Sequence, residues 1–173
     1  MALRDVLTFP NPVNEKAARS VAAGVVVLCA VALATQWWWL AALIAVGFAL
    51  RVAGGPRFSP LGRLAVHVVA PRFGEPRLVP GPPKRFAQTV GLVVSTVAAV
   101  AALGFDATTL ASVLLAVLLV FATLESAFGF CAGCWAFGHL MRLGVIPEET
   151  CEACNDITLR QRDRDHERTP QTT

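Results

Sequence analysis

Charged residues are scarce in this sequence, and long stretches have none at all. Only 16% of the 173 residues are charged, against ~25% in ordinary soluble domains. No charged residue lies between Arg19 and Arg51, and the stretch 86–141 holds only two carboxylates, Asp106 and Glu125. The composition is 55% hydrophobic, with a mean hydropathy of +0.57. These properties argue against a soluble domain with buried helical hairpins and predict membrane-spanning helices.

Two further absences narrow the class of protein. The first apolar stretch lacks a clear small-residue cleavage site and is too long for the hydrophobic region of a signal peptide. The chain also has no internal repeat of solenoid length. Its length suits one domain. We therefore expect a single four-helix transmembrane domain over residues 1–157, followed by a tail, 158–173, whose mixed charges and few apolar residues predict disorder.

The uncharged stretch Ser20–Leu50 predicts two helices rather than one. A single helix of that length would span about 46 Å, well beyond the ~30 Å hydrocarbon core of a bilayer. We place the turn at Thr35–Gln36, the most polar point, with helices over about 15–34 and 37–53. The three consecutive tryptophans at 37–39 are then expected at a membrane interface, where tryptophan is enriched.

The second half of the chain predicts two more membrane helices, over about 86–104 and 108–130. Between the two helix pairs, residues 60–70 predict a short amphipathic helix lying on the membrane surface. Its apolar residues recur at helical spacing, while Arg63 and His67 share another face.

The basic residues predict how the helices are oriented. All fifteen Lys and Arg lie in three segments, 1–19, 51–85 and 142–168, and the turns near Gln36 and Asp106 have none. By the positive-inside rule, this predicts a multi-pass protein of the cell inner (plasma) membrane with both termini cytoplasmic. The predicted fold class is all-α: an integral membrane four-helix bundle with a short interfacial amphipathic helix and a cytoplasmic Cys-rich C-terminal segment. We expect the lipid bilayer as a partner, and no nucleic acid.

The cysteines are the most informative polar residues of the chain. Four of the five form two Cys-x-x-Cys pairs: Cys131/Cys134 and Cys151/Cys154. Sixteen residues, 135–150, separate the pairs, a spacing within the window for a four-thiolate metal site, and each pair alone is typical of a redox dithiol. The Cys-rich segment, about 131–156, is predicted to lie where a membrane helix meets water. We expect the fifth cysteine, Cys29, to pack as a small apolar side chain.

Two kinds of chemistry fit the four cysteines, and their spacing does not decide between them. Because cytoplasmic thiols are kept reduced, one is a relay that exchanges electrons or sulfur with a soluble partner. In this relay, Cys151 near a helix N-terminus attacks a disulfide or persulfide of the partner, and Cys154 resolves the mixed disulfide that forms. Cys131 and Cys134 then pass the electrons or sulfur onward. A quinone beside the fourth helix is a candidate acceptor. The other is a zinc or iron–sulfur site that fixes the tail of a membrane scaffold or small transporter.

Two more ionisable residues are candidates for a role at this site. Glu125 is a carboxylate inside an otherwise apolar helix, which makes it a functional candidate, with snorkelling to the nearby interface as the alternative. His139 follows Cys131 by eight residues and is a candidate ligand or proton acceptor. An interfacial histidine near Arg142 is the simpler interpretation. If the fourth helix continues through Cys131 and Cys134, their sulfurs share one face.

Three stretches carry a resemblance to a known family: PKRFAQTVG, FGFCAGCW and GVIPEETCEACNDI. Over roughly residues 10–157 the chain resembles a bacterial membrane family catalogued as domain of unknown function 4395. The resemblance implies four membrane helices and no established activity. Genes of that family often lie beside genes for thioredoxin-like and rhodanese-type sulfurtransferase proteins, which implies a soluble partner of one of those kinds. The resemblance carries over to these residues: Arg85, Phe86, Cys131, Cys134, Cys151 and Cys154.

Overall fold

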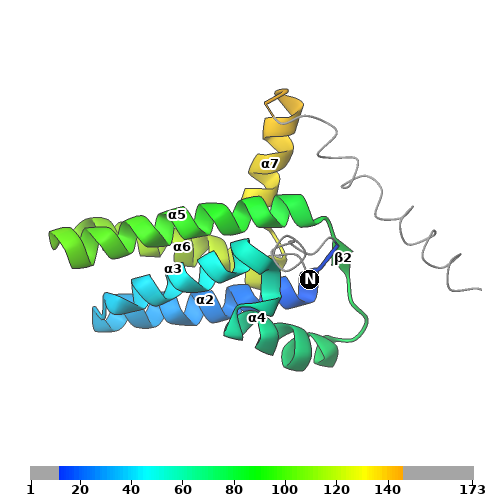
Figure 1. Ribbon diagram of the computed structural model, residues 1–173, viewed down its shortest axis with the longest axis horizontal. Coiled ribbons are helices and arrows are strands. Elements are labelled where there is room, and N and C mark those ends of the chain that lie inside the picture. The colour runs from blue at the N-terminus through cyan, green and yellow to red at the C-terminus, as the bar shows by residue number, and fades with distance from the viewer. Residues whose placement is uncertain (1–11, 146–173) are drawn as a thin grey trace, which may run out of the picture.

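The computed structural model describes residues 12–145, and this part of the chain is helical except for one pair of two-residue strands (Figure 1). Three helices are long and apolar enough to cross a membrane: α2 (Glu15–Thr35), α5 (Gly81–Phe105) and α6 (Thr108–Phe128). A fourth apolar helix, α3 (Trp39–Gly54), is shorter. The all-α class is therefore confirmed, together with three helices that fit a membrane protein.

Helices α2 and α3 form a hairpin, as the sequence predicted for the stretch Ser20–Leu50. The Asn14 side chain accepts a hydrogen bond from the Lys16 backbone N–H at 3.0 Å, which satisfies one of the free donors at the start of α2. The helix ends at Gln36, whose φ of 57° lies in the left-handed region and reverses the chain.

The segment after α3 differs from the single surface helix predicted over 60–70. It contains four short elements: η1 (Gly55–Arg57), α4 (Pro60–Leu64), the π-helical η2 (Ala65–Val69) and the 3₁₀-helical η3 (Ala70–Phe73). Ser59 caps α4 by accepting from the Gly62 backbone N–H. Three β-branched valines in residues 66–69 and the missing N–H of Pro71 weaken a regular α-helix here.

Helix α5 begins at Gly81, five residues earlier than predicted. The sequence favours an extended segment because of Pro82 and Pro83, but prolines are tolerated in the first turn of a helix, where their missing N–H needs no partner. Just before it, β2 (Leu78–Val79) pairs antiparallel with β1 (Val13–Asn14). This earlier start places Lys84 in the first turns of a long helix.

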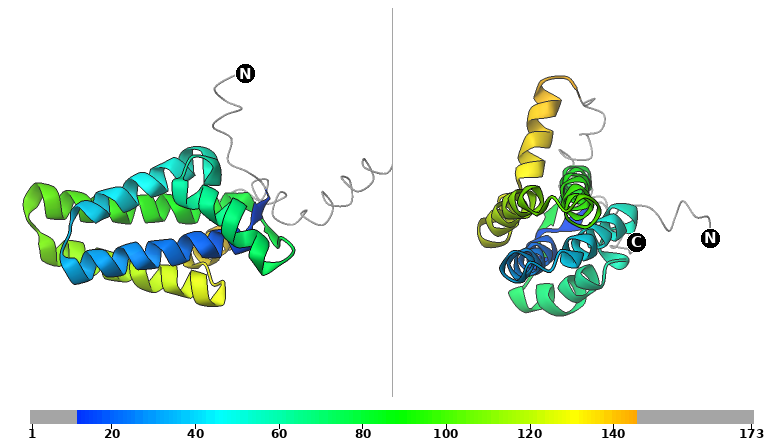
Figure 2. Two further views of the ribbon diagram at one scale, coloured as in Figure 1. Left: turned by 90° about the horizontal axis from the view of Figure 1, so that it is seen from below. Right: turned by 90° about the vertical axis from the view of Figure 1, so that its left-hand side faces the viewer.

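Helix α6 ends at Phe128, close to the predicted end at about residue 130, so it does not continue through Cys131 and Cys134. Gly129 has a φ of 71°, its N–H reaches the Glu125 carbonyl at 3.0 Å, and the Phe130 N–H reaches the Leu124 carbonyl at 3.3 Å. Such a C-cap closes a helix and is best made by glycine. A new helix, α7 (Ala132–Arg142), then leaves at a steep angle to the others (Figure 2).

Arg19 of α2 reinforces the end of α6. Its Nε donates to the Ser126 carbonyl at 3.1 Å and its Nη2 to the Ala127 carbonyl at 2.8 Å. These carbonyls belong to the last turn of the helix, where the carbonyl groups have no hydrogen-bond donors within the helix itself. A side chain from a distant helix thus holds the α6–α7 junction in place.

Helices α2, α3, α5 and α6 run side by side, with α3 along α5 and α2 along α6 (Figures 1 and 2). The core between them is lined by small and aliphatic side chains, and Cys29 is fully buried within it, as expected of an apolar cysteine. Many large apolar side chains on the outward faces remain exposed, including Val46, Val93 and Val120. Such surface is unusual in a soluble monomer and suits contact with lipid.

The two ends of these helices differ in charge. The turns at Gln36 and Asp106 lie at one end, which we call the turn end (Figure 1). The starts of α2 and α5 and the ends of α3 and α6 lie at the other, which we call the basic end. In the described part of the chain, every Lys and Arg lies on the elements that meet at the basic end or on α7.

Candidate functional site

Cys131 and Cys134 lie at the N-terminus of α7, against the start of α5. Cys131 is the N-cap residue, with extended backbone, and Cys134 is in the first turn. Both are free thiols; Cys131 is 8% exposed, whereas Cys134 is half-buried. Gly133 permits this close approach, because a Cβ there would lie 2.5 Å from the Ala87 Cβ. The first pair is therefore held against the helix that carries Lys84.

An ion pair lies beside the two thiols. Lys84 Nζ is 2.7 Å from Glu125 Oε1, and the two side chains are only 7% and 17% exposed. Glu125 therefore points inward and does not snorkel outward. The sequence analysis missed Lys84, although a signal was present: Lys84 and Glu125 lie at similar distances in sequence from the turn at Asp106, and a carboxylate in an apolar helix needs a partner.

The pKa values of the two thiols are driven apart. The hydrogen bond from the Cys134 thiol lowers the pKa of Cys131 from 9.0 to about 7; burial and the charge of Glu125 oppose this shift, and the charge of Lys84 supports it. The same hydrogen bond, together with burial, raises the pKa of Cys134. Cys131 is thus the thiol that ionises near neutral pH, while Cys134 keeps its proton.

This asymmetry gives the two sulfurs different chemistry. A thiol of low pKa is ionised near neutral pH and is also a good leaving group in thiol–disulfide exchange. Cys134, which keeps its proton, is the more exposed residue of the pair.

Arg51, at the end of α3, is a second buried cation near the site. Its Nε donates to Gln88 Oε1 at 2.8 Å and one Nη donates to Ser59 Oγ at 3.5 Å. Its guanidinium lies 4.4 Å from the centroid of the Phe48 ring. Arg51 is only 4% exposed, so it does not reach out to water as an interfacial arginine would.

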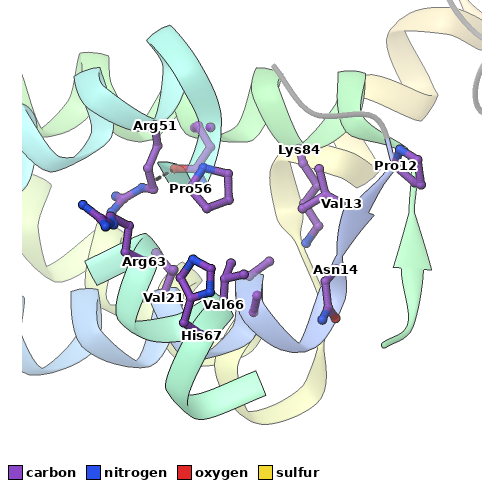
Figure 3. Close-up of a pocket in the computed structure, with 14 residues that line it drawn as sticks. Pro12, Val13, Asn14, Val21, Arg51, Pro56, Arg63, Val66, His67 and Lys84 are labelled. Carbon is purple, nitrogen blue, oxygen red and sulfur yellow. Dashed lines mark hydrogen bonds between the residues drawn. The ribbon is translucent and has the colours of Figure 1, made fainter. Parts of the chain in front are cut away.

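Two cavities flank Arg51 and Gln88. The first, of about 320 Å³, is shown in Figure 3, and because Arg51, Arg63, His67 and Lys84 line it, we call it the cationic cavity. The second, of about 330 Å³, is lined mainly by apolar side chains and reaches Cys131 and Glu125; we call it the thiol cavity. Arg51 and Gln88 line both, so the two cavities adjoin.

The other predicted site residues have different surroundings, and two of them lie outside the described residues. The ring of His139 packs against Trp135, with centroids 4.1 Å apart. Phe86 lines the thiol cavity and packs on Phe137, whereas Arg85 is exposed. Cys151 and Cys154 are not among residues 12–145, so the meeting of the two pairs stays a prediction.

Half of the predicted four-thiolate ligand set lies within the described residues. Cys131 and Cys134 supply two thiolates, whereas a structural zinc site needs four ligands. Within residues 12–145, no group of three or more His, Cys, Asp or Glu side chains is arranged to hold a metal ion. A zinc or iron–sulfur site would therefore depend on Cys151 and Cys154.

Comparison with known proteins gives one match. A family model described as Domain of unknown function (DUF4395) matches residues 13–142. The matched stretch begins at β1 and ends with α7, and it includes Lys84, Glu125, Cys131 and Cys134. No curated protein and no solved structure matches the chain. The ion pair and the first cysteine pair are therefore within the matched domain.

Proposed function

The chain thus belongs to the DUF4395 family, and we propose that it is an integral membrane thiol redox protein that relays electrons through Cys131 and Cys134. The observation that carries this proposal is the placement of an asymmetric Cys-x-x-Cys pair at a helix N-terminus beside the buried Lys84–Glu125 ion pair. Reactive dithiols have this combination of helix N-terminus and nearby positive charge.

In this proposal, helices α2, α3, α5 and α6 all cross the membrane. The 16 residues of α3 span only about 24 Å, and the tryptophans at 37–39 extend its reach into the interface. The basic end faces the cytoplasm, because Lys and Arg are retained on that side, and both termini then lie there in the inner membrane. Residues 60–73 lie at the cytoplasmic interface. The reactive pair is thereby offered to soluble cytoplasmic partners.

The soluble partner reacts at Cys134. When Cys131 and Cys134 are joined as a disulfide, a partner thiolate attacks the Sγ of Cys134, the more exposed residue, and Cys131 leaves as the stabilised thiolate. A second partner thiol then attacks the mixed disulfide, so the partner becomes oxidised and Cys134 is released as a thiol. A thioredoxin-like dithiol fits this exchange. A rhodanese-type carrier, which would deliver sulfane sulfur, is the alternative partner.

The electrons then leave through the thiol cavity, for which we propose a membrane quinone as acceptor. Phe48, Phe86 and Phe121 line this cavity, and Cys131 borders it. Apolar and aromatic walls with a few polar groups are typical of sites for such ligands. The two thiols lose two electrons and two protons and form the Sγ–Sγ bond, and one quinone is reduced to its hydroquinone. Over the whole cycle, the soluble dithiol supplies the two electrons and the quinone accepts them.

Trapping distinguishes the roles of the two thiols. Cys131→Ser should accumulate a mixed disulfide between Cys134 and a thioredoxin whose resolving cysteine is replaced, as measured by non-reducing electrophoresis after mild oxidation. Cys134→Ser should trap much less, because Cys131 is only 8% exposed. Cys29→Ala is the matched control and should leave trapping unchanged. Equal trapping by both variants would contradict the assigned roles.

The same variants test the metal alternative. A four-thiolate zinc or iron–sulfur site predicts bound metal in the purified protein, thiols protected until chelation, and loss of that metal in Cys131→Ser. Elemental analysis and thiol counting before and after chelation measure both. The redox proposal predicts no stoichiometric metal and two free thiols at Cys131 and Cys134 in the reduced protein.

A further inference from the structure

The cationic cavity is a concave space lined by charges of one sign. Four basic side chains line it, from α3, α4, η2 and α5, and none of its lining residues in the described part of the chain is a carboxylate. Figure 3 shows Arg51 reaching toward it from one side, and Arg63 and His67 from the segment below. The amides of Asn14 and Gln88 add polar groups. Concave surfaces of one charge sign concentrate counter-ions of the opposite sign.

Arg51 has hydrogen-bonding capacity that the protein does not use. A guanidinium carries five N–H donors, and within residues 12–145 its hydrogen bonds are those to Gln88 and Ser59. The ion pairs of the same part of the chain do not include Arg51. Because Arg51 is 4% exposed, its remaining donors are largely removed from bulk water. Unsatisfied donors on a buried charge are costly, and an anion would satisfy them.

The other cations of the cavity differ in how far their charge is compensated. Lys84 is paired with Glu125 at 2.7 Å. Arg63 lies four residues before His67, so both side chains lie on one side of the α4–η2 segment, and both are exposed. In the described part of the chain, Arg51 and Arg63 thus have no carboxylate within ion-pair distance.

The rest of the wall is apolar. Val13, Val21, Pro56 and Val66 line the cavity beside these cations. The cavity also lies at the basic end of the helices, where α2 and α5 begin. A ligand that fits both parts of the wall has an anionic group and an adjoining apolar part.

We propose that the cationic cavity binds a phosphate ester, with Arg51 and Arg63 holding the phosphate oxygens. Guanidinium groups match phosphate geometry through paired N–H donors, which ammonium groups cannot do as well. The phosphate can belong to the headgroup of an anionic phospholipid or to a free phosphate compound. The site does not involve the cysteines, so it is independent of the proposed redox function.

Binding can be tested with the full-length protein in neutral detergent, using dihexanoylphosphatidic acid and inorganic phosphate as probes and dihexanoylphosphatidylcholine as the zwitterionic control. Calorimetric titration should show saturable binding of the phosphatidic acid. Arg63→Gln should weaken it about tenfold or more, since a hydrogen bond to a charged group is lost. Arg72→Gln removes the same charge from an exposed position outside the cavity and should change the affinity less than twofold.

The arms of the experiment also identify the source of the phosphate. Binding of the lipid alone indicates a headgroup site, and binding of inorganic phosphate with similar affinity indicates a free phosphate compound. Arg51→Gln, checked for folding by circular dichroism, should weaken either ligand at least as much as Arg63→Gln. The proposal is overturned if neither probe binds, or if Arg63→Gln and Arg72→Gln weaken binding equally.

Discussion

The two cavities that share Arg51 and Gln88 have helices α2, α3 and α5 in common but present different chemistry. The cationic cavity collects basic side chains and has no carboxylate among its described lining residues. The thiol cavity is mostly apolar and borders a thiol and a carboxylate, Cys131 and Glu125. Their similar volumes show that size does not separate their roles. What separates them is which elements complete each wall: α4 and η2 supply cations to the first, whereas α6 and the start of α7 supply apolar side chains, Glu125 and Cys131 to the second.

Lys84 connects the two cavities electrostatically. It lines the cationic cavity, yet its ammonium group pairs with Glu125, and its charge lowers the pKa of Cys131. Glu125 therefore has two effects: it neutralises one cation of the first cavity and opposes ionisation of the thiol at the second. Substitutions at this pair, at Arg19 and at Cys29 should affect the two cavities differently.

The largest effect is expected for Lys84→Ala. Removing one partner of a buried ion pair leaves the other charge uncompensated, and we expect a loss of about 3–5 kcal/mol in the free energy of unfolding. The double variant Lys84→Met, Glu125→Leu removes both charges and should recover most of that loss. Denaturant unfolding in detergent measures both. If the double variant is as unstable as Lys84→Ala, an uncompensated buried charge is not the cause of the lost stability.

Arg19→Met should have an intermediate effect, confined to the thiol cavity. It removes two charge-assisted hydrogen bonds to the end of α6, with an expected cost of about 2 kcal/mol in the free energy of unfolding. Because this end positions Cys131, trapping of a thioredoxin at Cys134 should change, while phosphate binding should not. Arg85→Met, at an exposed position, is the control. Equal losses of stability in the two variants would contradict the capping role of Arg19.

Glu125→Gln should change the ionisation of Cys131, and its structural effect should be smaller than that of Lys84→Ala because the glutamine keeps an acceptor oxygen for the Lys84 ammonium group. The carboxylate raises the pKa of Cys131, so its removal should lower that pKa below about 7. Lys84→Met should shift the pKa in the opposite direction, because the lysine charge lowers it. The pH dependence of alkylation in protein that retains Cys131 and Cys134 but has the other cysteines replaced measures both shifts. Shifts of the same sign in the two variants would contradict this electrostatic account.

The smallest effect is expected for Cys29→Ala. Cys29 is fully buried in the core, so the substitution removes one sulfur atom from a packed site and should cost about 1 kcal/mol in the free energy of unfolding. Thioredoxin trapping and phosphate binding should both be unchanged. Loss of either activity would show that Cys29 has a function beyond packing.

Local signals in the sequence predicted much of the fold. Asn14 and Glu15 mark the start of α2, and Gln36 and Asp106 are the polar residues at which the two helical hairpins turn. These features depend on residues that are close in sequence. The early start of α5 was missed because Pro82 and Pro83 suit either an extended segment or a first helical turn, and the local sequence does not decide between them.

Only part of the site was predicted, because only some of its residues can be recognised from the local sequence. The residue types at Glu125, Cys131 and Cys134 stand out in an apolar sequence, so they could be named as candidates. The partner Lys84 is 41 residues from Glu125, and their contact depends on how α5 packs on α6. The burial of Arg51 also depends on contacts between helices that are distant in sequence. Neither cavity can be inferred from residue spacing alone.

The ionisation of Cys131 is the most direct test of the proposed redox role. The measurement is the rate of alkylation of Cys131 by a small reagent, followed by mass spectrometry between pH 5 and pH 10 in the reduced full-length protein. The proposed roles predict a half-maximal rate near pH 7 for Cys131, with Cys134 reacting only at much higher pH. A midpoint for Cys131 near 9.0, the ordinary value for a thiol, or equal profiles for the two cysteines, would contradict the assignment of Cys131 as the stabilised thiolate.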